Sequence, residues 1–383
     1  MKKLTIPAIL VIAFVLRPVV AQIGPILGLL QTGLSITDTE LALLTAIPVL
    51  CFGFGAFAAP WLVRRLGIEQ SMVYLLAIQL LAVVVRPYLG FWGFVVGTTI
   101  AGLSIAVANV LLPSIVRERF ENNVVFMTSA YTTVLAASAS FAAAISFPAA
   151  ATMGWQFSLA IWGLPSLLAV LLSIALLKTK VQVATEVDHR DHSAQWKSVL
   201  KSPITWWVTA LFGLQSLGFY ALLGWLPSMG ISAGLDPASA GGLLGLMTII
   251  GVPVRFMLAS HIGKFMKPAT EGVLISTITL IGIALLLGQF WLPAVILISI
   301  GQAASFPLSL SLISTRASNM ELTTILSSVA QGVGYLVAAV GTFLVGLLGA
   351  ASGDWSWSIW LLVLITLVQA FSAYFAGLPR KIA

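Results

Sequence analysis

The chain has 383 residues, of which 59% are hydrophobic and 8% are charged. Soluble domains carry about 25% charged residues, so this composition excludes a soluble globular enzyme. The single cysteine, Cys51, excludes an intrachain disulfide. The formal charge of +7 is spread thinly between apolar segments, which indicates membrane-topology signals rather than a surface for nucleic acid.

The chain begins with Lys2, Lys3 and an apolar run, as a signal peptide would. The run continues past the usual length of a signal peptide, contains Arg17 and offers no small-residue cleavage site before Gln31. We therefore expect this run to be a first transmembrane helix that the mature protein retains.

Twelve apolar stretches follow one another in two sets of six, and each reaches the roughly 20 residues that span a bilayer. They cover about 5–30, 40–62, 70–89, 91–116, 124–150, 155–177, 203–227, 237–261, 270–289, 291–315, 322–348 and 356–377. The stretches predict an all-α integral membrane protein with twelve transmembrane helices in two six-helix, pseudo-symmetric bundles. The expected domains are residues 1–178 and 203–383, joined by a cytoplasmic linker at 179–202.

The positive charges support this count and give an orientation. With the amino terminus in the cytoplasm, every Lys and Arg except Arg17, Arg86 and Arg255 falls in an inside loop or at an inside helix end. We therefore expect a multi-pass protein of the inner (plasma) membrane with both termini in the cytoplasm.

The two halves repeat with an offset near 200 residues. The segment that starts at Gly102 parallels the one that starts at Gly301, so that Arg117 matches Arg316. Parallel six-helix repeats about an axis along the membrane normal are typical of transporters whose halves rock around a central site.

Several motifs resemble one family. They are Leu16-Arg17, Gly24-Pro25, LLTAIPVL, APWLVRRLGIEQS, NVLLPSIVRERF, SPITWW through GWLP, and AQGVGY. Over nearly the whole chain the sequence resembles the cyanate and 2-nitroimidazole transporter branch of the major facilitator superfamily. The resemblance implies a secondary transporter that works by alternating access.

The chain also departs from broader patterns of that superfamily. Val63 stands where an aspartate usually precedes the basic pair Arg64 and Arg65, which puts the usual charge-relay latch in doubt. The fifth predicted helix lacks the glycine-rich motif of proton-driven drug antiporters, which argues against multidrug export.

Three arginines lie inside predicted helices, where a charge is costly and marks a functional site by default. Arg17 lies about 18 Å into the first helix, near the midplane, and could anchor an oxyanion or bond backbone carbonyls instead. Arg255 could form a cavity wall or extend toward water. Arg86, near the end of its helix, is expected to extend to the interface.

All twelve Asp and Glu residues fall in loops or at helix ends. Buried positive charge without a buried carboxylate favours anions and disfavours cationic drugs. It also leaves His261 and the solute itself as the candidate proton carriers, although an ordinary interfacial role suits His261 better.

Polar residues on the cavity helices could orient a ligand by hydrogen bonds, although each could equally join neighbouring helices. They are Asn109, Tyr131, Gln215, Tyr220 and Gln331, which with Arg17 and Arg255 form the predicted substrate site. No cofactor or metal site is expected, because no phosphate-binding glycine loop, metal-ligand spacing or nucleophile elbow occurs. His189 and His192 in the linker are a weak metal or pH signal.

The sequence thus predicts a transporter, not an enzyme, that moves a small anionic or polar solute across the inner membrane. Cyanate-like, nitroaromatic and small carboxylate solutes all fit, with protons as a candidate co-substrate and a monomer as the default assembly. The alternative is an exporter of neutral or weakly acidic toxic compounds, with the buried arginines acting as gates.

Overall fold

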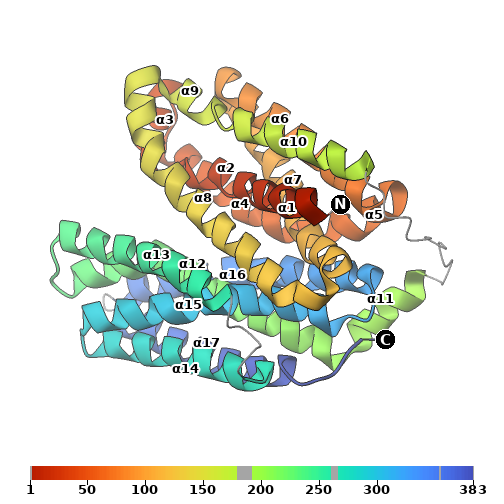
Figure 1. Ribbon diagram of the computed structural model, residues 1–383. Coiled ribbons are helices and arrows are strands. Elements are labelled where there is room, and N and C mark those ends of the chain that lie inside the picture. The colour runs from red at the N-terminus through yellow and green to blue at the C-terminus, as the bar shows by residue number, and fades with distance from the viewer. Residues whose placement is uncertain (1, 179–191, 260–265, 353–354, 383) are drawn as a thin grey trace. The chain divides into compact units, whose positions relative to one another are not determined.

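The computed structural model describes residues 2–178, 192–259, 266–352 and 355–382, and this part of the chain is almost wholly helical (Figure 1). Its one β-type contact is an isolated parallel bridge between Ala317 and Ile382. The predicted all-α class is therefore confirmed.

The chain divides into two compact units. Unit 1 comprises Met1–Ile115 and Val134–Trp196, and unit 2 comprises Val116–Thr133 and Lys197–Ala383. The last residues of α7 and the first ten of α8 thus belong to unit 2, although they come from the first half of the sequence.

The helices up to the linker are α1 (Lys2–Val15), α2 (Pro18–Ala21), η1 (Gly24–Ile26), α3 (Leu27–Leu34), α4 (Asp38–Gly55), η2 (Ala56–Ala58), α5 (Ala59–Leu66), α6 (Ile68–Val85), η3 (Arg86–Tyr88), α7 (Gly90–Arg119), η4 (Glu121–Asn123), α8 (Val124–Met153), α9 (Trp155–Ala160) and α10 (Gly163–Lys178). The later helices are α11 (His192–Lys201), α12 (Pro203–Ser232), α13 (Pro237–Ala259), α14 (Pro268–Leu287), α15 (Trp291–Arg316), α16 (Met320–Ser352) and α17 (Ser356–Ala376).

Eleven helices of the described chain are long and apolar enough to cross a membrane, and Ser239–Arg255 is a shorter apolar helix. The shorter helix lies in α13, where the eighth span was predicted, and the eleven match the other predicted spans. The protein is therefore a multi-pass membrane protein with the predicted sequence of helices.

In unit 1, α4 begins with a capping box. The Thr37 hydroxyl accepts a hydrogen bond from the Glu40 amide (3.3 Å), and the Thr37 amide donates to the Glu40 carboxylate (2.8 Å). Together they satisfy two amides at a helix start that have no partner within the helix. The bonds from Thr37 hold the pKa of the Glu40 carboxyl below its ordinary value.

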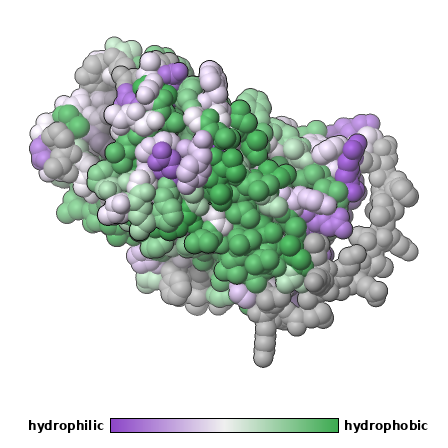
Figure 2. Space-filling view, turned by 90° about the horizontal axis from the view of Figure 1, so that it is seen from above, coloured by the Kyte–Doolittle hydropathy of each residue, from purple (hydrophilic) through white to green (hydrophobic). Residues whose placement is uncertain are grey.

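Unit 1 also turns large apolar side chains outward. α6 and α10 pack against each other, yet Leu81, Leu164 and Leu171 are each more than half exposed. Figure 2 shows hydrophobic residues over much of the face that it presents, with hydrophilic residues mostly near its ends. Because so large an apolar surface is unfavourable in water, we interpret it as surface that contacts lipid.

In unit 2, α12 and α16 approach closely at two glycines. A Cβ atom added to Gly213 would lie 3.0 Å from the α-carbon of Gly334, so a side chain at either position would push the helices apart. Small residues of this kind allow the backbones of membrane helices to meet. The crossing fixes the neighbouring side chains of both helices, which carry several predicted site residues.

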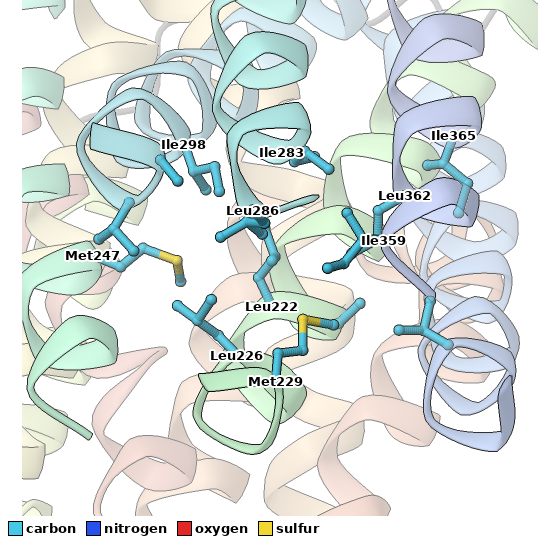
Figure 3. Close-up of a cluster of buried hydrophobic side chains, with 14 of the residues drawn as sticks. Leu222, Leu226, Met229, Met247, Ile283, Leu286, Ile298, Ile359, Leu362 and Ile365 are labelled. Atoms are coloured by element: carbon cyan, nitrogen blue, oxygen red, sulfur yellow. The ribbon is translucent and has the colours of Figure 1, made fainter. Parts of the chain in front are cut away.

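Beside this crossing, unit 2 has an apolar core built from α12–α17. Leu222 and Leu226 of α12 meet Ile283 and Leu286 of α14 and Leu362 of α17 (Figure 3). These five side chains are at most 2% exposed. The core joins α14 and α17 to α12.

Candidate functional site

The first predicted span is broken at Arg17. α1 ends at Val15 and α2 begins at Pro18, which has no amide hydrogen to continue the helical ladder. The side-chain amide of Gln79 in α6 donates a hydrogen bond to the Val15 carbonyl at this break (2.8 Å). Broken membrane helices of this kind are tolerated where they line a site or are buried in protein.

Arg17 stands at this break, at the N-cap of α2, and its side chain makes no cap hydrogen bond. The side chain is partly buried, and its guanidinium carbon lies 5.8 Å from the centre of the Phe52 ring. This distance suits a cation–π contact, which holds the guanidinium without neutralising its charge. Asn109 of α7, 7% exposed, is the other predicted site residue in unit 1.

Five predicted site residues lie in unit 2, and an aromatic group at the α12–α16 crossing lies among them. Tyr335 of α16 meets Phe212 edge-on, with ring centres 5.1 Å apart, and its ring centre is 6.4 Å from that of Tyr220. Phe212 also lies 6.0 Å from Phe306 of α15. The predicted residue Tyr220 is therefore part of an aromatic surface that α12, α15 and α16 build together.

The two predicted glutamines at this crossing bond within their own helices. The Gln215 amide donates to the Ser216 hydroxyl (2.7 Å) and the Phe212 carbonyl (3.1 Å). The Gln331 amide donates to the Ser327 hydroxyl (2.8 Å). Both side chains are 2% exposed, so these bonds fix the direction of two buried amides.

Tyr131 of α8 is 1% exposed, and its hydroxyl has no hydrogen-bond partner. Tyr335 of α16 lies in the neighbourhood of this hydroxyl. A buried hydroxyl without a partner is costly unless something else bonds it. Tyr131 therefore offers a free donor and acceptor beside the aromatic surface.

Arg255 of α13 bends back along its own helix. A Cβ atom added to Gly251 would lie 3.2 Å from the Arg255 Nη1 atom and 3.9 Å from the Ala303 side chain of α15. The guanidinium group therefore lies on the face of α13 that is turned toward Ala303. The Gln302 amide nitrogen in turn lies 2.9 Å from the position of a Cβ on Gly218 of α12.

Unit 2 thus holds five of the predicted site residues, together with Tyr335 and Gln302. The five are Tyr131, Gln215, Tyr220, Arg255 and Gln331. Sequence reasoning missed Tyr335 and Gln302. Tyr335 follows Gln331 by four residues, a helical spacing that places both on one face, and this could have found it. Only the packing of α12 against α15 could have found Gln302.

The prediction for Arg86 is wrong. Its side chain is 1% exposed and does not extend to an interface. Its guanidinium donates to the Thr98 hydroxyl (3.1 Å) and the Val19 carbonyl (3.1 Å), and it lies 5.1 Å from the centre of the Phe94 ring. Arg86 therefore ties α2 and α7 together inside unit 1.

Two further arginines bond the carboxyl ends of helices in unit 2. Arg117, in the last turn of α7, donates to the carbonyls of Ser314 and Ser318, the latter at 2.7 Å. Arg316, in the last turn of α15, donates to the carbonyls of Ala376 and Gly377, both at 2.9 Å. The last carbonyls of a helix lack partners within it and carry partial negative charge, so both arginines stabilise them.

The carboxylates that the structure describes lie at helix ends or in turns, as predicted. They are Asp38, Glu40, Glu69, Glu118, Glu121, Asp236, Glu271 and Glu321. Within the described residues, no group of three or more His, Cys, Asp or Glu side chains could hold a metal ion. The predictions for His189 and His261 lie outside the described residues, and His192 begins α11.

Comparison with known proteins gives one family and several near full-length relatives. The family model of the Major Facilitator Superfamily matches residues 9–341. The uncharacterized transporter YycB of Bacillus subtilis is 33% identical over 383 residues, 98% of this chain and 94% of that protein. The 2-nitroimidazole transporter of Escherichia coli is 30% identical, with 98% of this chain and 96% of that protein covered. The cyanate transport protein CynX of Escherichia coli is 25% identical, with 92% of each protein covered.

Among solved structures, the transporter FucP in its outward conformation superposes with a TM-score of 0.77 at 17% identity. The match covers 97% of this chain and 98% of FucP. At this identity the likeness concerns the fold, which agrees with the helices described above.

Proposed function

Because this chain belongs to the major facilitator superfamily, we propose that it is a secondary or facilitative transporter of a small anionic or polar solute. Cyanate-like compounds, nitroaromatics and small carboxylates are the candidate classes, and alternating access is the mechanism. The relatives include a cyanate and a 2-nitroimidazole transporter, and they are transporters rather than enzymes. We place the protein in the inner membrane as a monomer with both termini in the cytoplasm.

The observation that carries this proposal is the partly buried Arg17 at a helix break, in a protein whose described carboxylates lie at helix ends or in turns. An arginine is always protonated and presents a planar fork of donors that matches an oxyanion. Such a charge inside a membrane protein attracts anions more strongly than it would in water.

We assign Arg17 as the main anchor of the solute. The other predicted residues would orient the solute: Asn109, Tyr131, Gln215, Tyr220, Arg255 and Gln331. In this proposal the two sequence halves, residues 1–178 and 203–383, rock about the solute and are joined by the linker at 179–202. A transported proton would be carried by the solute itself or by His261.

One observation favours the alternative, an exporter of neutral or weakly acidic toxic compounds in which arginines act as gates. Arg86, Arg117 and Arg316 all donate to backbone carbonyls. Arginines in this protein therefore do bond helix backbones. If Arg17 does the same, it is a gate rather than an anchor.

The test is thermal unfolding of detergent-purified protein with small anions, nitroaromatics and their neutral analogues. A compound that binds the folded state raises the unfolding temperature by mass action. We expect anions to stabilise wild type and not Arg17→Gln, whereas Arg65→Gln, which removes an exposed charge beside Trp61, should respond as wild type does. If only neutral compounds stabilise the protein, or Arg17→Gln responds fully, the anchor role is lost and the exporter proposal gains.

A further inference from the structure

We propose that Gln79 and Arg86 are positioning residues for Arg17, because each bonds the carbonyl of a residue two positions away from it. Gln79 bonds Val15 on one side of the helix break, and Arg86 bonds Val19 on the other side. This inference rests on the proposed function, in which Arg17 anchors the solute. It assigns the placement of that anchor to two buried side chains of α6 and η3.

The backbone around the break has few bonds of its own to hold Arg17. Pro18 has no amide hydrogen, so the helical ladder cannot run unbroken from α1 into α2. α2 is four residues long. After it, the Ile23 amide donates to the Val20 carbonyl (3.3 Å), whereas in a regular helix it would donate to Val19. Because so short a helix is not stable by itself, contacts from other helices must fix its position.

Gln79 and Arg86 are spaced so that they reach both sides of the break. They are seven residues apart, about two helical turns, and therefore lie on one face. Arg86 is the C-cap of α6 and keeps α-helical backbone angles (φ −52°, ψ −36°), so this face continues up to it. The two carbonyls that they bond are four residues apart, with Arg17 midway between them. One face of α6 and η3 thus holds the chain before and after Arg17.

The Arg86 side chain is itself fixed by α7. Its guanidinium also donates to the Thr98 hydroxyl (3.1 Å) and lies 5.1 Å from the centre of the Phe94 ring. A Cβ atom added to Gly97 would lie 2.5 Å from the Arg86 Cβ atom, so a glycine at this position allows α7 to approach. The guanidinium therefore has a fixed direction, and its bond to Val19 places α2 relative to α7.

Both positioning side chains leave one polar atom without a partner. The Gln79 Oε1 and Arg86 Nε atoms are buried and make no hydrogen bond, and each side chain is 1% exposed. Such atoms are costly inside a protein, and an apolar side chain of similar size would avoid the cost. An amide and a guanidinium supply what an apolar side chain cannot, a bond of fixed direction. This supports a role in geometry rather than in stability alone.

The geometry matters at Arg17 because its side chain is partly buried, with the guanidinium carbon 5.8 Å from the centre of the Phe52 ring. An arginine that binds an oxyanion must present its planar fork in one direction. A displaced backbone at Arg17 changes that direction. It should therefore weaken the binding of anions and leave the binding of neutral molecules, which do not use the charge, unchanged.

The first test measures the placement of position 17 without any solute. In a Cys51→Ser background, Arg17→Cys introduces the only cysteine of the chain, and a small methanethiosulfonate reagent modifies it in detergent. Adding Gln79→Leu, which keeps the approximate size of the side chain and removes the donor, should raise the rate several-fold, because the loosened segment opens more often. Arg86→Met should do the same.

The matched control for both tests is Gln369→Leu. It removes a 1% exposed amide of α17 that donates to two serine hydroxyls within unit 2. This variant should lower the unfolding temperature and leave the reactivity at position 17 and the affinity for anions unchanged. It thus separates a loss of stability from a loss of placement.

The second test connects the positioning role to the proposed function. Calorimetry on the full-length protein in detergent measures affinities for the anions benzoate, acetate and cyanate and for the neutral analogues benzamide and acetamide. Gln79→Leu should weaken the anions that bind wild type by about tenfold and leave the affinity for the amides unchanged. Arg86→Met should act in the same direction, and Arg86→Lys, which keeps the charge and a donor, should have a smaller effect.

The outcomes distinguish this inference from the proposed function. The inference is overturned if Gln79→Leu and Arg86→Met leave the reactivity at position 17 unchanged. It is also overturned if Gln79→Leu leaves the affinity for a bound anion unchanged, or weakens anions and amides equally. If wild type binds none of the anions while both substitutions raise the reactivity, the proposed function fails, and Gln79 and Arg86 still position the break.

Discussion

Arg117 and Arg316 occupy matching positions in the two halves of the sequence, and each bonds the carboxyl end of a different helix. Arg316 is 8% exposed and connects α15 to α17, two helices of the second half. Arg117 is partly exposed and connects α7, from the first half, to the end of α15. The repeated sequence therefore gives two arginines that make the same kind of hydrogen bond with different partners.

This difference in partners indicates what the contacts of Arg117 and Arg316 each do in a protein whose two halves rock. Under the proposed alternating access, the bonds of Arg316 persist, since both helices move together. The bonds of Arg117 join helices of different halves and must break when that end of the protein opens. Arg316 should thus matter for stability, and Arg117 should matter for the balance between conformations.

Arg316→Met is expected to have the largest effect on stability. It removes two bonds from a buried guanidinium to helix-end carbonyls, at a cost of about 2–4 kcal/mol. Thermal unfolding in detergent measures the loss. Arg380→Met, which removes an exposed charge near the same end, is the control and should change little. An equal response from both variants would remove the distinction between Arg316 and an ordinary surface arginine.

Ile382→Asp tests the segment that holds the α15 end in place. Ile382 is 2% exposed, its amide donates to the Arg316 carbonyl (2.8 Å) and its carbonyl accepts from the Ser318 amide (3.1 Å). Because a carboxylate cannot remain buried there, both bonds should be lost, at about 1–2 kcal/mol. Chemical denaturation reports this cost. Unchanged stability would mean that the tail does not support the turn to which Arg117 binds.

Arg117→Met should cost less than about 1 kcal/mol, because partly exposed charges contribute little. It should instead open the end of α15. In a Cys51→Ser background, a cysteine at Ser314, which is 0% exposed, should react with maleimide several-fold faster in the Arg117→Met variant. If reactivity stays the same and stability falls as in Arg316→Met, then Arg117 is a structural residue like Arg316.

The smallest effect is expected at the amino end of a helix, in the capping box of α4. Glu40→Gln weakens the capping box of α4, which is solvent-exposed, and should barely change the unfolding temperature at neutral pH. The pKa of Glu40 is lowered in the folded state, so its contribution is present above the unfolded pKa of about 4.3 and is lost as pH falls through the lower folded pKa. The difference between wild type and variant should therefore shrink below about pH 4. A difference that grows in acid would contradict this cap.

Much of the fold could be predicted because the bilayer imposes a length on every apolar segment. The eighth span, for example, was predicted although α13 contains a shorter apolar stretch than the others. Composition and periodicity report such features directly, since they depend on neighbouring residues.

The partners of buried polar groups could not be predicted in the same way. Arg86 donates to the carbonyl of Val19, which is 67 residues away, and no residue near Arg86 in the sequence indicates that this carbonyl is its partner. Gln302 was missed for the same reason, because its surroundings depend on Gly218 of another helix. Whether a buried polar residue is structural or available to a solute is decided by contacts between helices.

The most direct test of the account is uptake of labelled solute into proteoliposomes by wild type, Arg17→Gln and Arg65→Gln. The account predicts saturable uptake of at least one small anionic or polar planar compound. Arg17→Gln should reduce that uptake by about tenfold or more, and Arg65→Gln should leave it unchanged. If wild type transports none of the candidate classes above the level of protein-free liposomes, or Arg17→Gln transports all of them at the wild-type rate, the account is contradicted.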